Sequence, residues 1–266
     1  MIHKAKKSLG QNFLKSPVAL HEIIKAGEIK PNDTILEIGP GKGALTGKLL
    51  ENADRVIAVE KDRELFVFLQ EKFAKEIADK KLVLAEGDIL NFNLVEHLPK
   101  NKKYKIIANI PYNITGIILK KFLTGDTSLG GQPESMILLL QYEVVKRIMA
   151  HDKKESLLSI SVRAYGEPKM IMKVPARFFS PSPMVDSAVI SITNITKKLF
   201  NENGIEESTF WSTVKFGFAH KRKKLSGNLP KLRAKAENSS ELSILAEKRA
   251  ENLSLKDWIV LVKAGI

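Results

Sequence analysis

The feature that most constrains the fold is a regular alternation of short apolar runs with helical patterns over the first 195 residues. Short runs rich in β-branched side chains are typical of buried strands, whereas apolar residues spaced three and four apart are typical of helices. This alternation predicts an α/β fold with a doubly wound parallel sheet. The strand-like runs are residues 34–38, 55–60, 81–86, 104–109, 136–141, 169–174 and 185–193.

The pattern changes near residue 195. Within the first 195 residues, Ser16 and Pro17 predict the start of a first helix, and further helices are expected over 43–51 and 62–79.

Beyond residue 196 only helical periodicity remains. The sequence therefore predicts an α/β domain at 1–195 and a small α-helical domain at 196–266.

Composition excludes several classes of protein. The chain of 266 residues is 44% hydrophobic and has no cysteine, so it can bury a core but has no disulfide, thiol nucleophile or Cys-ligated metal. Its apolar runs are shorter than the ~20 residues of a membrane span, and its start lacks the apolar segment of a signal peptide. We expect a cytoplasmic protein without a metal ion or a membrane partner.

The net charge of +13 is concentrated in two stretches, residues 1–15 and 211–235, which contain basic residues and no acidic ones. The rest of the chain is nearly neutral. Localised positive charge favours a polyanionic partner such as a nucleic acid, because each neutralised phosphate releases counterions. The alternative is that these lysines only form solvated surface.

A glycine-rich segment follows the first strand-like run. Gly39, Gly41 and Gly43 allow a tight turn into a helix whose N-terminal N–H groups face a ligand. Glu60 ends the next strand-like run, 21 residues after Gly39, where an acid can accept both ribose hydroxyls of a nucleoside. The spacing to Ala44 also fits the NAD fingerprint, so a nicotinamide-dependent oxidoreductase is an alternative.

Two further acids lie at strand ends. Asp88 follows the third strand-like run, where its carboxylate could accept from an adenine amino group or could simply form a turn or helix cap. Glu37 precedes Gly39 by two residues, a position typical of the acid beside the cationic methionine end in S-adenosylmethionine enzymes. A buried structural glutamate is its alternative.

The fourth strand-like run ends in Asn109-Ile110-Pro111-Tyr112. If the Asn109 side-chain oxygen and the Pro111 carbonyl each accept one hydrogen of an aromatic amino group, they orient its nitrogen toward an electrophilic methyl group. Tyr112 could stack on a base extruded from its helix. A binding protein that retained the fold without the chemistry is a third hypothesis, against which these intact motifs argue.

These motifs resemble the ribosomal RNA adenine dimethyltransferases, in the family's order, from about residue 8 to 230. The resemblance implies a Rossmann-like class I methyltransferase sheet that binds S-adenosyl-L-methionine and dimethylates adenine 6-amino groups. The segments that carry it are SLGQNFL (8–14), EIGPGKGALT (37–46), VIAVEKD (56–62), EGDIL (86–90), NIPYNI (109–114), FFSPSPMVDSAV (178–189) and FAHKRKKLSGNL (218–229).

The resemblance also implies roles for individual residues. Phe179 would stack on the flipped adenine opposite Tyr112, while Asn109 and Pro111 hold its amino group. A core aromatic at a strand end is the alternative for Phe179. The basic segment would bind RNA through Lys221, Arg222, Lys223 and Lys224. The residues implied to bind the cofactor are Asn12, Leu14, Gly39, Gly41, Glu60, Asp88 and Asn109.

The segment KRKKLSGNL resembles the housekeeping members, which dimethylate two adjacent adenines in a 3'-terminal hairpin of small-subunit (16S) rRNA during ribosome biogenesis. The resemblance therefore implies a monomer acting on a pre-ribosomal subunit, with the resistance-type large-subunit enzymes as the alternative. Met184, Tyr142 and the pair Glu155-Ser156 depart from the family pattern. These departures concern RNA contacts more than methyl transfer.

Overall fold

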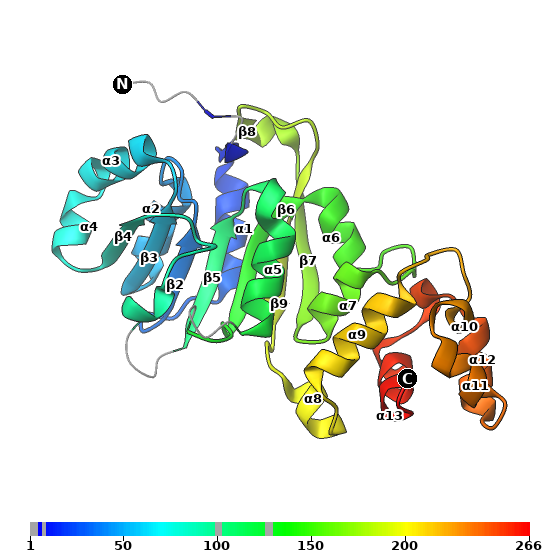
Figure 1. Cartoon of the computed structure of the whole chain (residues 1–266). Helices are drawn as coiled ribbons and strands as arrows, with labels where there is room; N and C mark the ends of the chain where they lie inside the picture. Colours follow the sequence, from blue (N-terminus) through cyan, green and yellow to red (C-terminus); the bar gives the residue numbers. More distant parts are fainter. Residues whose placement is uncertain (1–4, 7–8, 99–102, 126–129) are drawn as a thin grey trace. The chain divides into compact units, whose positions relative to one another are not determined.

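The structure is a computed structural model that describes residues 5–6, 9–98, 103–125 and 130–266. The chain forms two compact units (Figure 1). Unit 1 comprises residues 1–145 and 167–195, and unit 2 comprises residues 146–166 and 196–266. The chain passes from unit 1 to unit 2 between residues 195 and 196, where the sequence predicts a domain boundary. Residues 146–166 differ from that prediction, because they group with the C-terminal helices.

Unit 1 is built on a seven-stranded sheet with the order β4-β3-β2-β5-β6-β9-β7. The first five strands in this order are parallel, as the alternation predicts. The strands are β2 (Thr34–Ile38), β3 (Arg55–Glu60), β4 (Leu82–Glu86), β5 (Tyr104–Asn109), β6 (Ser135–Gln141), β7 (Glu167–Val174) and β9 (Ser187–Thr193).

Contrary to the prediction from the sequence pattern, the sheet is not wholly parallel, because strand β9 runs in the opposite direction. It runs antiparallel to both of its neighbours, β6 and β7. The segment that joins β7 to β9 contains a 3₁₀ turn at Ala176–Phe178 and the two-residue strand β8 (Phe179–Ser180). Because this segment has no α-helix to carry the chain back across the sheet, β9 returns in the opposite direction.

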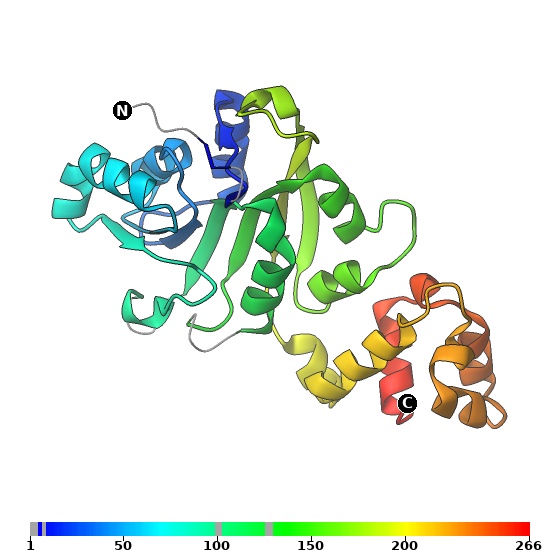
Figure 2. The same cartoon turned by 45° about the horizontal axis from the view of Figure 1, so that its top comes forward.

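Helices cover both faces of the sheet. Figures 1 and 2 show α1 (Pro17–Gly27) and α5 (Thr115–Thr124) on opposite faces. Helix α1 begins where the sequence predicts, with the Ser16 hydroxyl accepting from the Ala19 amide at 3.2 Å. Helix α2 (Ala44–Asn52) also agrees with its prediction, whereas the helix expected over 62–79 breaks at Phe73 into α3 (Arg63–Lys72) and α4 (Ala74–Ala78).

The sheet register brings functional side chains to one edge. Every residue of β2 is buried. Its Leu36 pairs with Ile57 of β3 and with Ile106 of β5, so the carboxyl ends of these three strands lie side by side. Ligands of doubly wound folds bind at this edge. The register therefore positions the strand-end motifs next to one another.

A separate two-stranded sheet attaches the N-terminal segment to unit 1. Strand β1 (Phe13–Leu14) pairs antiparallel with β8, so that Phe13 lies opposite Ser180 and Leu14 opposite Phe179. We call the described residues 5–6 and 9–15 the arm. Two short strands far apart in the sequence thus hold the end of the arm beside the sheet.

Unit 2 is entirely helical in its described secondary structure. Trp258 and Phe210 are fully buried in it, and Gly217 lies so close that a Cβ there would stand 2.3 Å from the Trp258 ring. Tyr165 joins residues 146–166 to this unit by hydrogen bonds to Glu207 and to Trp211 Nε1. The helices are α7 (Leu157–Arg163), α8 (Lys198–Asn203), α9 (Glu207–Gly217), α10 (Leu225–Asn228), α11 (Pro230–Ala236), α12 (Ser240–Glu247) and α13 (Leu255–Lys263), with α6 (Tyr142–Ile148) spanning the division at 145/146.

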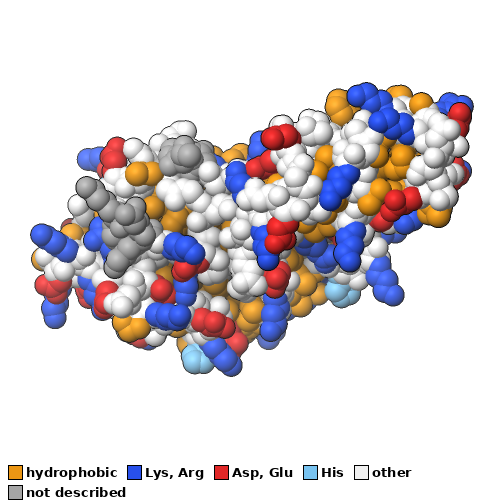
Figure 3. Space-filling model, turned by 90° about the horizontal axis from the view of Figure 1, so that it is seen from below, with side chains coloured by type: hydrophobic (Ala, Val, Ile, Leu, Met, Phe, Trp, Pro, Cys, Tyr) orange, Lys and Arg blue, Asp and Glu red, His pale blue; other side chains and the backbone are white. Residues whose placement is uncertain are grey.

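Charged side chains of both signs are mixed on the face drawn in Figure 3, where lysines and arginines alternate with acidic residues. Among the helices of the described residues, none has the length and apolar character needed to cross a membrane.

Candidate active site

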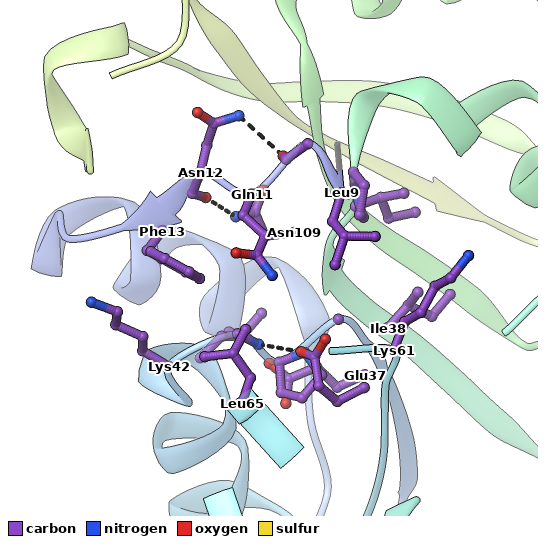
Figure 4. A pocket seen from close by; sticks show the side chains of 18 of the residues that line it. Leu9, Gln11, Asn12, Phe13, Glu37, Ile38, Lys42, Lys61, Leu65 and Asn109 are labelled. Carbon is purple, nitrogen blue, oxygen red and sulfur yellow. Dashed lines mark hydrogen bonds between the residues drawn. The ribbon is translucent and has the colours of Figure 1, made fainter. Parts of the chain in front are cut away.

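A cavity of about 720 Å³ lies at the carboxyl ends of the parallel strands. The arm lines it together with the strand ends, and Figure 4 shows Gln11, Asn12 and Phe13 of the arm around the same cavity as Glu37 and Asn109. The structure thus brings together residues from five distant segments. The predicted site residues that line the cavity are Asn12, Leu14, Gly39, Gly41, Glu60, Asp88, Asn109, Pro111 and Tyr112.

The glycine turn between β2 and α2 forms one wall. Gly41 has a φ of 60°, a left-handed conformation that favours glycine. A Cβ at this position would stand 3.0 Å from the ring of Phe13, which therefore packs directly on the turn. The Gly41 amide donates to Glu60 Oε2 at 3.0 Å. Glycine is needed here so that the arm can approach the turn closely.

Glu60 ends β3, as the sequence predicts, and is 5% exposed. Its Oε1 accepts from the Asp62 amide at 2.9 Å and its Oε2 from Gly41. Burial raises the pKa of Glu60, against the effect of these backbone donors. Each carboxylate oxygen has two lone pairs, so the group can still accept from a ligand hydroxyl.

Asp88 lies just beyond β4. Its Oδ1 accepts from the Leu90 amide at 3.0 Å, which is the turn-forming role, and its Oδ2 accepts from Lys61 Nζ at 2.8 Å. Burial raises the pKa of Asp88, but these donors outweigh that effect and lower the pKa overall. The Asp88 carboxylate therefore stabilises the local turn through its bond to Leu90 and also lines the cavity.

Glu37 is the buried carboxyl group of the site. It is 1% exposed, and its Oε2 has no hydrogen-bond partner among the residues that the structure describes. Burial raises the pKa of Glu37 to about 8, with the Thr46 hydroxyl opposing the shift only in part. A buried carboxylate without a partner is costly, so a cationic ligand group beside it would be favoured.

Asn109 ends β5 with a defined amide orientation. Its Nδ2 donates to the Asn12 carbonyl of the arm at 3.1 Å (Figure 4). Because a carbonyl oxygen can only accept, the NH₂ group must face Asn12, and the side-chain oxygen remains available as an acceptor. A sequence pattern alone does not give this orientation, since the partner lies 97 residues away.

Pro111 and Tyr112 continue from Asn109 into a 3₁₀ turn at Tyr112–Ile114. The Pro111 carbonyl accepts from the Ile114 amide at 3.2 Å and retains a second lone pair. The Tyr112 hydroxyl lies 2.7 Å from Ser187 Oγ, which positions the phenol ring. Burial raises the pKa of Tyr112, so its hydroxyl stays protonated at neutral pH.

Phe179 is not brought to the cavity. It is 3% exposed and packs in the hydrophobic core with Leu14, whereas the next residue, Ser180, lines the cavity. Stacking of Phe179 on a flipped base stays a prediction, and it would require the ring to leave this buried position. In the pairing of β1 with β8, Phe179 lies opposite Leu14, and both side chains are buried.

The predicted RNA-binding residues, 221–224, belong to unit 2. They lie in the exposed turn between α9 and α10, where Lys224 is paired with Glu247. In the other basic stretch, Lys6 contacts Asp62 and Glu64, and Lys15 is exposed. Lys4 and Lys7 lie outside the described residues.

Several residues that organise the site have no recognisable signal for that role in the sequence. Lys61 orients Asp88, Ser187 holds Tyr112, and Gln11 donates to Asp62 at 2.8 Å. Asp62 falls in the recognisable segment VIAVEKD, and its place before α3 indicates only a helix cap. Their contacts come from distant parts of the chain, so no local pattern reveals them.

The mixed sheet, the glycine turn and the strand-end acids around one cavity define a class I S-adenosylmethionine-dependent methyltransferase. Residues 2–265 match the family model described as ribosomal RNA adenine dimethylase. The chain therefore belongs to the ribosomal RNA adenine dimethylase family. S-adenosylmethionine is accordingly its cofactor, and hydride transfer to a nicotinamide is not supported.

Relatives support the same placement. The chain is 37% identical to a ribosomal RNA small subunit methyltransferase A of Dehalococcoides mccartyi, over 97% of this chain and 87% of the relative. It is 36% identical to the ribosomal RNA small subunit methyltransferase A of Fusobacterium nucleatum, over 99% of this chain and 98% of the relative. A dimethyladenosine transferase structure from Plasmodium falciparum has a TM-score of 0.76 at 26% identity, over 96% of this chain and 98% of the other.

The residues present fit the cofactor. S-adenosylmethionine carries a positive charge, and the Glu37 oxygen that lacks a partner among the described residues is a buried site for a cation. Glu60 and Asp88 provide acceptors on the same cavity wall for the hydroxyl and amino groups of a nucleoside. A side chain on the turn would push Phe13 away from Gly41 and open this wall.

Proposed function

We propose that this protein uses S-adenosylmethionine to dimethylate the 6-amino groups of two adjacent adenines in a 3'-terminal hairpin of small-subunit (16S) rRNA. It would act as a monomer, in the cytoplasm, on a pre-ribosomal subunit during ribosome biogenesis. The observation that carries the proposal is the Asn109 amide, whose acceptor oxygen lies in the same cavity as the Glu37 carboxylate. The names of the small-subunit relatives support the target.

When bound, S-adenosylmethionine supplies an electrophilic methyl group on a positively charged sulfur. The aromatic amino group of adenine is a poor nucleophile because its lone pair is delocalised into the ring. In the first transfer, Asn109 and Pro111 orient the amine by accepting its two hydrogens, through the side-chain oxygen and the backbone carbonyl. The nitrogen lone pair is then directed away from both acceptors, toward the cofactor side of the cavity. In the second transfer the methylated nitrogen has one hydrogen left, which one of these acceptors holds.

This chemistry depends on alignment, because no strong general base is needed to activate the amine. The arm contributes through the Asn12 carbonyl, which holds the Asn109 amide in the productive orientation. Tyr112 is held by Ser187 and offers a ring on which the adenine can stack. The proton released on methylation passes to solvent at the open side of the cavity.

The alternative target is large-subunit rRNA, as in the antibiotic-resistance enzymes. A solved structure named 23S rRNA methyltransferase ErmE has a TM-score of 0.74 at 23% identity, which shows the shared fold alone. The basic turn of unit 2 and the names of the relatives favour the small subunit. The two targets are separated by the position of the product in the two rRNAs.

The test is mass mapping of dimethyladenosine in both rRNAs after incubation of undermethylated ribosomal subunits with the protein and S-adenosylmethionine. We expect paired dimethyladenosines near the 3' end of small-subunit rRNA only. In Asn109→Ala, which removes the acceptor oxygen, methyl transfer should fall by roughly a hundredfold or more. Binding of RNA should persist, because Asn109 provides alignment rather than phosphate contacts.

Lys48→Ala provides a matched control, since it removes an exposed ion pair with Glu51 on α2 and leaves the cavity intact. Its activity should equal that of the wild type. Dimethyladenosine confined to large-subunit rRNA would overturn the choice of target. Full activity in Asn109→Ala would overturn the mechanism.

A further inference from the structure

Three polar side chains join the arm to the segment that follows β3. Lys6 Nζ lies 2.9 Å from Asp62 Oδ1, and Gln11 Nε2 donates to Asp62 Oδ2 at 2.8 Å. The Lys6 amide also donates to Gln11 Oε1 at 2.8 Å, so the two arm residues support each other. We call Lys6, Gln11 and Asp62 the arm clasp.

Asp62 is the buried member of the arm clasp. Its side chain is 0% exposed, although that of Lys6 is 38% exposed. Burial alone would raise the pKa of Asp62, but the bonds from Lys6 and Gln11 lower it overall. Loss of these two donors would leave the Asp62 carboxylate less well stabilised, although the Glu64 amide would still donate to its Oδ1. Release of the arm is therefore unfavourable while Asp62 is ionised.

The arm clasp is connected to the cofactor side of the cavity through the backbone. The Asp62 amide donates to Glu60 Oε1 at 2.9 Å, and Glu60 is the acid implied to bind the ribose. Residues Leu9 to Lys15 line the cavity directly beyond the clasp. One residue thus contacts the cofactor-binding acid through its backbone and the arm through its side chain.

The same arm extends to the target side of the cavity. The Asn12 carbonyl accepts from Asn109, and Phe13 covers the glycine turn while Lys42 Nζ stands 4.9 Å from its ring centroid. If the arm moved away, the Asn109 amide would lose the partner that orients it. The position of the arm therefore affects both how long the cofactor stays bound and how the target amine is aligned.

We propose that Asp62 is a positioning residue that clasps the arm over the cofactor cavity through Lys6 and Gln11, and thereby slows cofactor release. This inference rests on the proposed function for the identity of the cofactor. Lys6, which the sequence places in a basic stretch suited to RNA, instead serves the cofactor cavity. Asp62 itself touches neither cofactor nor RNA in this role.

A purely structural role for Asp62 is the competing explanation. Its Oδ1 also accepts from the Glu64 amide at 3.0 Å, which caps α3. Asp62→Ser keeps a capping oxygen but removes the charge and one of the two acceptor atoms. Lys6→Met and Gln11→Leu disrupt the clasp from the arm side and leave the helix cap untouched. If all three variants release the arm to a similar extent, the effect comes from loss of the clasp and not from loss of the helix cap.

The experiment measures the dissociation rate of S-adenosylmethionine by stopped-flow displacement, and hydrogen exchange of arm amides in the ligand-free protein. We expect Lys6→Met and Asp62→Ser each to speed dissociation by about tenfold, as for loss of a hydrogen bond to a charged group. The double variant should be slower than fully additive effects require, because both changes break the Lys6–Asp62 pair, although Lys6 also contacts Glu64 and Asp62 also accepts from Gln11. Arm amides should exchange faster in each variant.

Lys48→Met is the matched control, because it loses an exposed lysine–glutamate pair in unit 1 that is not part of the clasp. It should dissociate the cofactor at the wild-type rate. An unchanged rate and unchanged arm exchange in Lys6→Met would overturn the proposal, as would fully additive effects in the double variant. If Asp62→Ser fails to fold, Lys6→Met alone provides the test, because Lys6, unlike Gln11, does not line the cavity.

The two proposals fail in distinguishable ways. If the wild-type protein does not bind S-adenosylmethionine, the proposed function is wrong, and arm exchange alone then decides whether the clasp holds the arm. If cofactor binding is normal but no variant releases the arm, only the clasp is wrong.

Discussion

The two basic stretches have the same sequence signature and different structures. Each is rich in lysine and contains no acid, and together they account for almost all of the net charge. In the arm, Lys6 is paired with Asp62 and Glu64 of unit 1. In unit 2, Lys221, Arg222 and Lys223 are exposed in a turn, and within the described part of the chain they form no ion pair.

A local count of charged residues is therefore not enough to identify an RNA-binding surface. The acid that neutralises Lys6 lies 56 residues away in the sequence and reaches it only because β3 ends beside the arm. Among the described residues, the turn in unit 2 has just one such partner, Glu247, which contacts Lys224. We therefore expect RNA contacts from the turn to be stronger than those from the described part of the arm.

Replacing Lys221, Arg222 and Lys223 together by alanine should have the largest effect on RNA binding. Affinity should fall by roughly a hundredfold at low salt, because released counterions dominate such binding. The slope of log affinity against log salt should become shallower by roughly one unit for each phosphate that the variant no longer neutralises. Filter binding to a small-subunit rRNA hairpin between about 50 and 200 mM salt measures both effects.

The matched control is a triple alanine variant of Lys75, Lys80 and Lys81, which lie in α4 and in the turn before β4, away from the cavity. It removes the same formal charge from the protein. Equal losses in the two variants would mean that net charge, rather than the turn, attracts the RNA, and the contrast between the stretches would then disappear.

Much of the fold could be predicted from local patterns. The run 34–38 and its neighbours form the parallel strands that the alternation indicates, and Ser16 caps the first helix as expected. The antiparallel direction of β9 was missed, because apolar runs carry no information on direction. The break at Phe73 was also missed, since apolar periodicity continues across it.

The site was predictable where chemistry follows a strand end. Glu60, Asp88 and Asn109 line one cavity because parallel strands end at one edge. The buried position of Phe179 and the clasping of Lys6 by Asp62 depend on tertiary contacts between distant segments. No periodicity or spacing within one segment contains that information.

Glu37 contrasts with the basic turn, because its carboxyl group is buried whereas the charges of the turn are exposed. In the free protein the pKa of Glu37 is about 8, and a bound cation would favour its ionised form. Cofactor binding should then release a proton, so affinity should rise with pH by about tenfold between pH 7 and 9 and level off above. Calorimetry across this range measures the change.

Glu37→Gln is the control for this prediction, since its side chain cannot ionise. Any pH dependence that it retains belongs to the cofactor or to other groups. A wild-type affinity that falls with rising pH, or a slope unchanged in Glu37→Gln, would contradict the assignment of Glu37 to the cationic part of the ligand.

Two single substitutions in the arm, Lys6→Met and Lys15→Met, test directly whether the arm binds RNA as the basic turn does. Lys6→Met should leave the salt dependence of RNA binding unchanged, because Lys6 is already paired with two carboxylates and releases no counterions on binding RNA. Lys15→Met, at an exposed position on the same arm, should make the slope shallower by up to about one unit. Filter binding of both variants with one hairpin compares them under identical conditions. A slope change in Lys6→Met equal to that in Lys15→Met would show that RNA takes Lys6 from Asp62, and the arm would then bind RNA as the turn does.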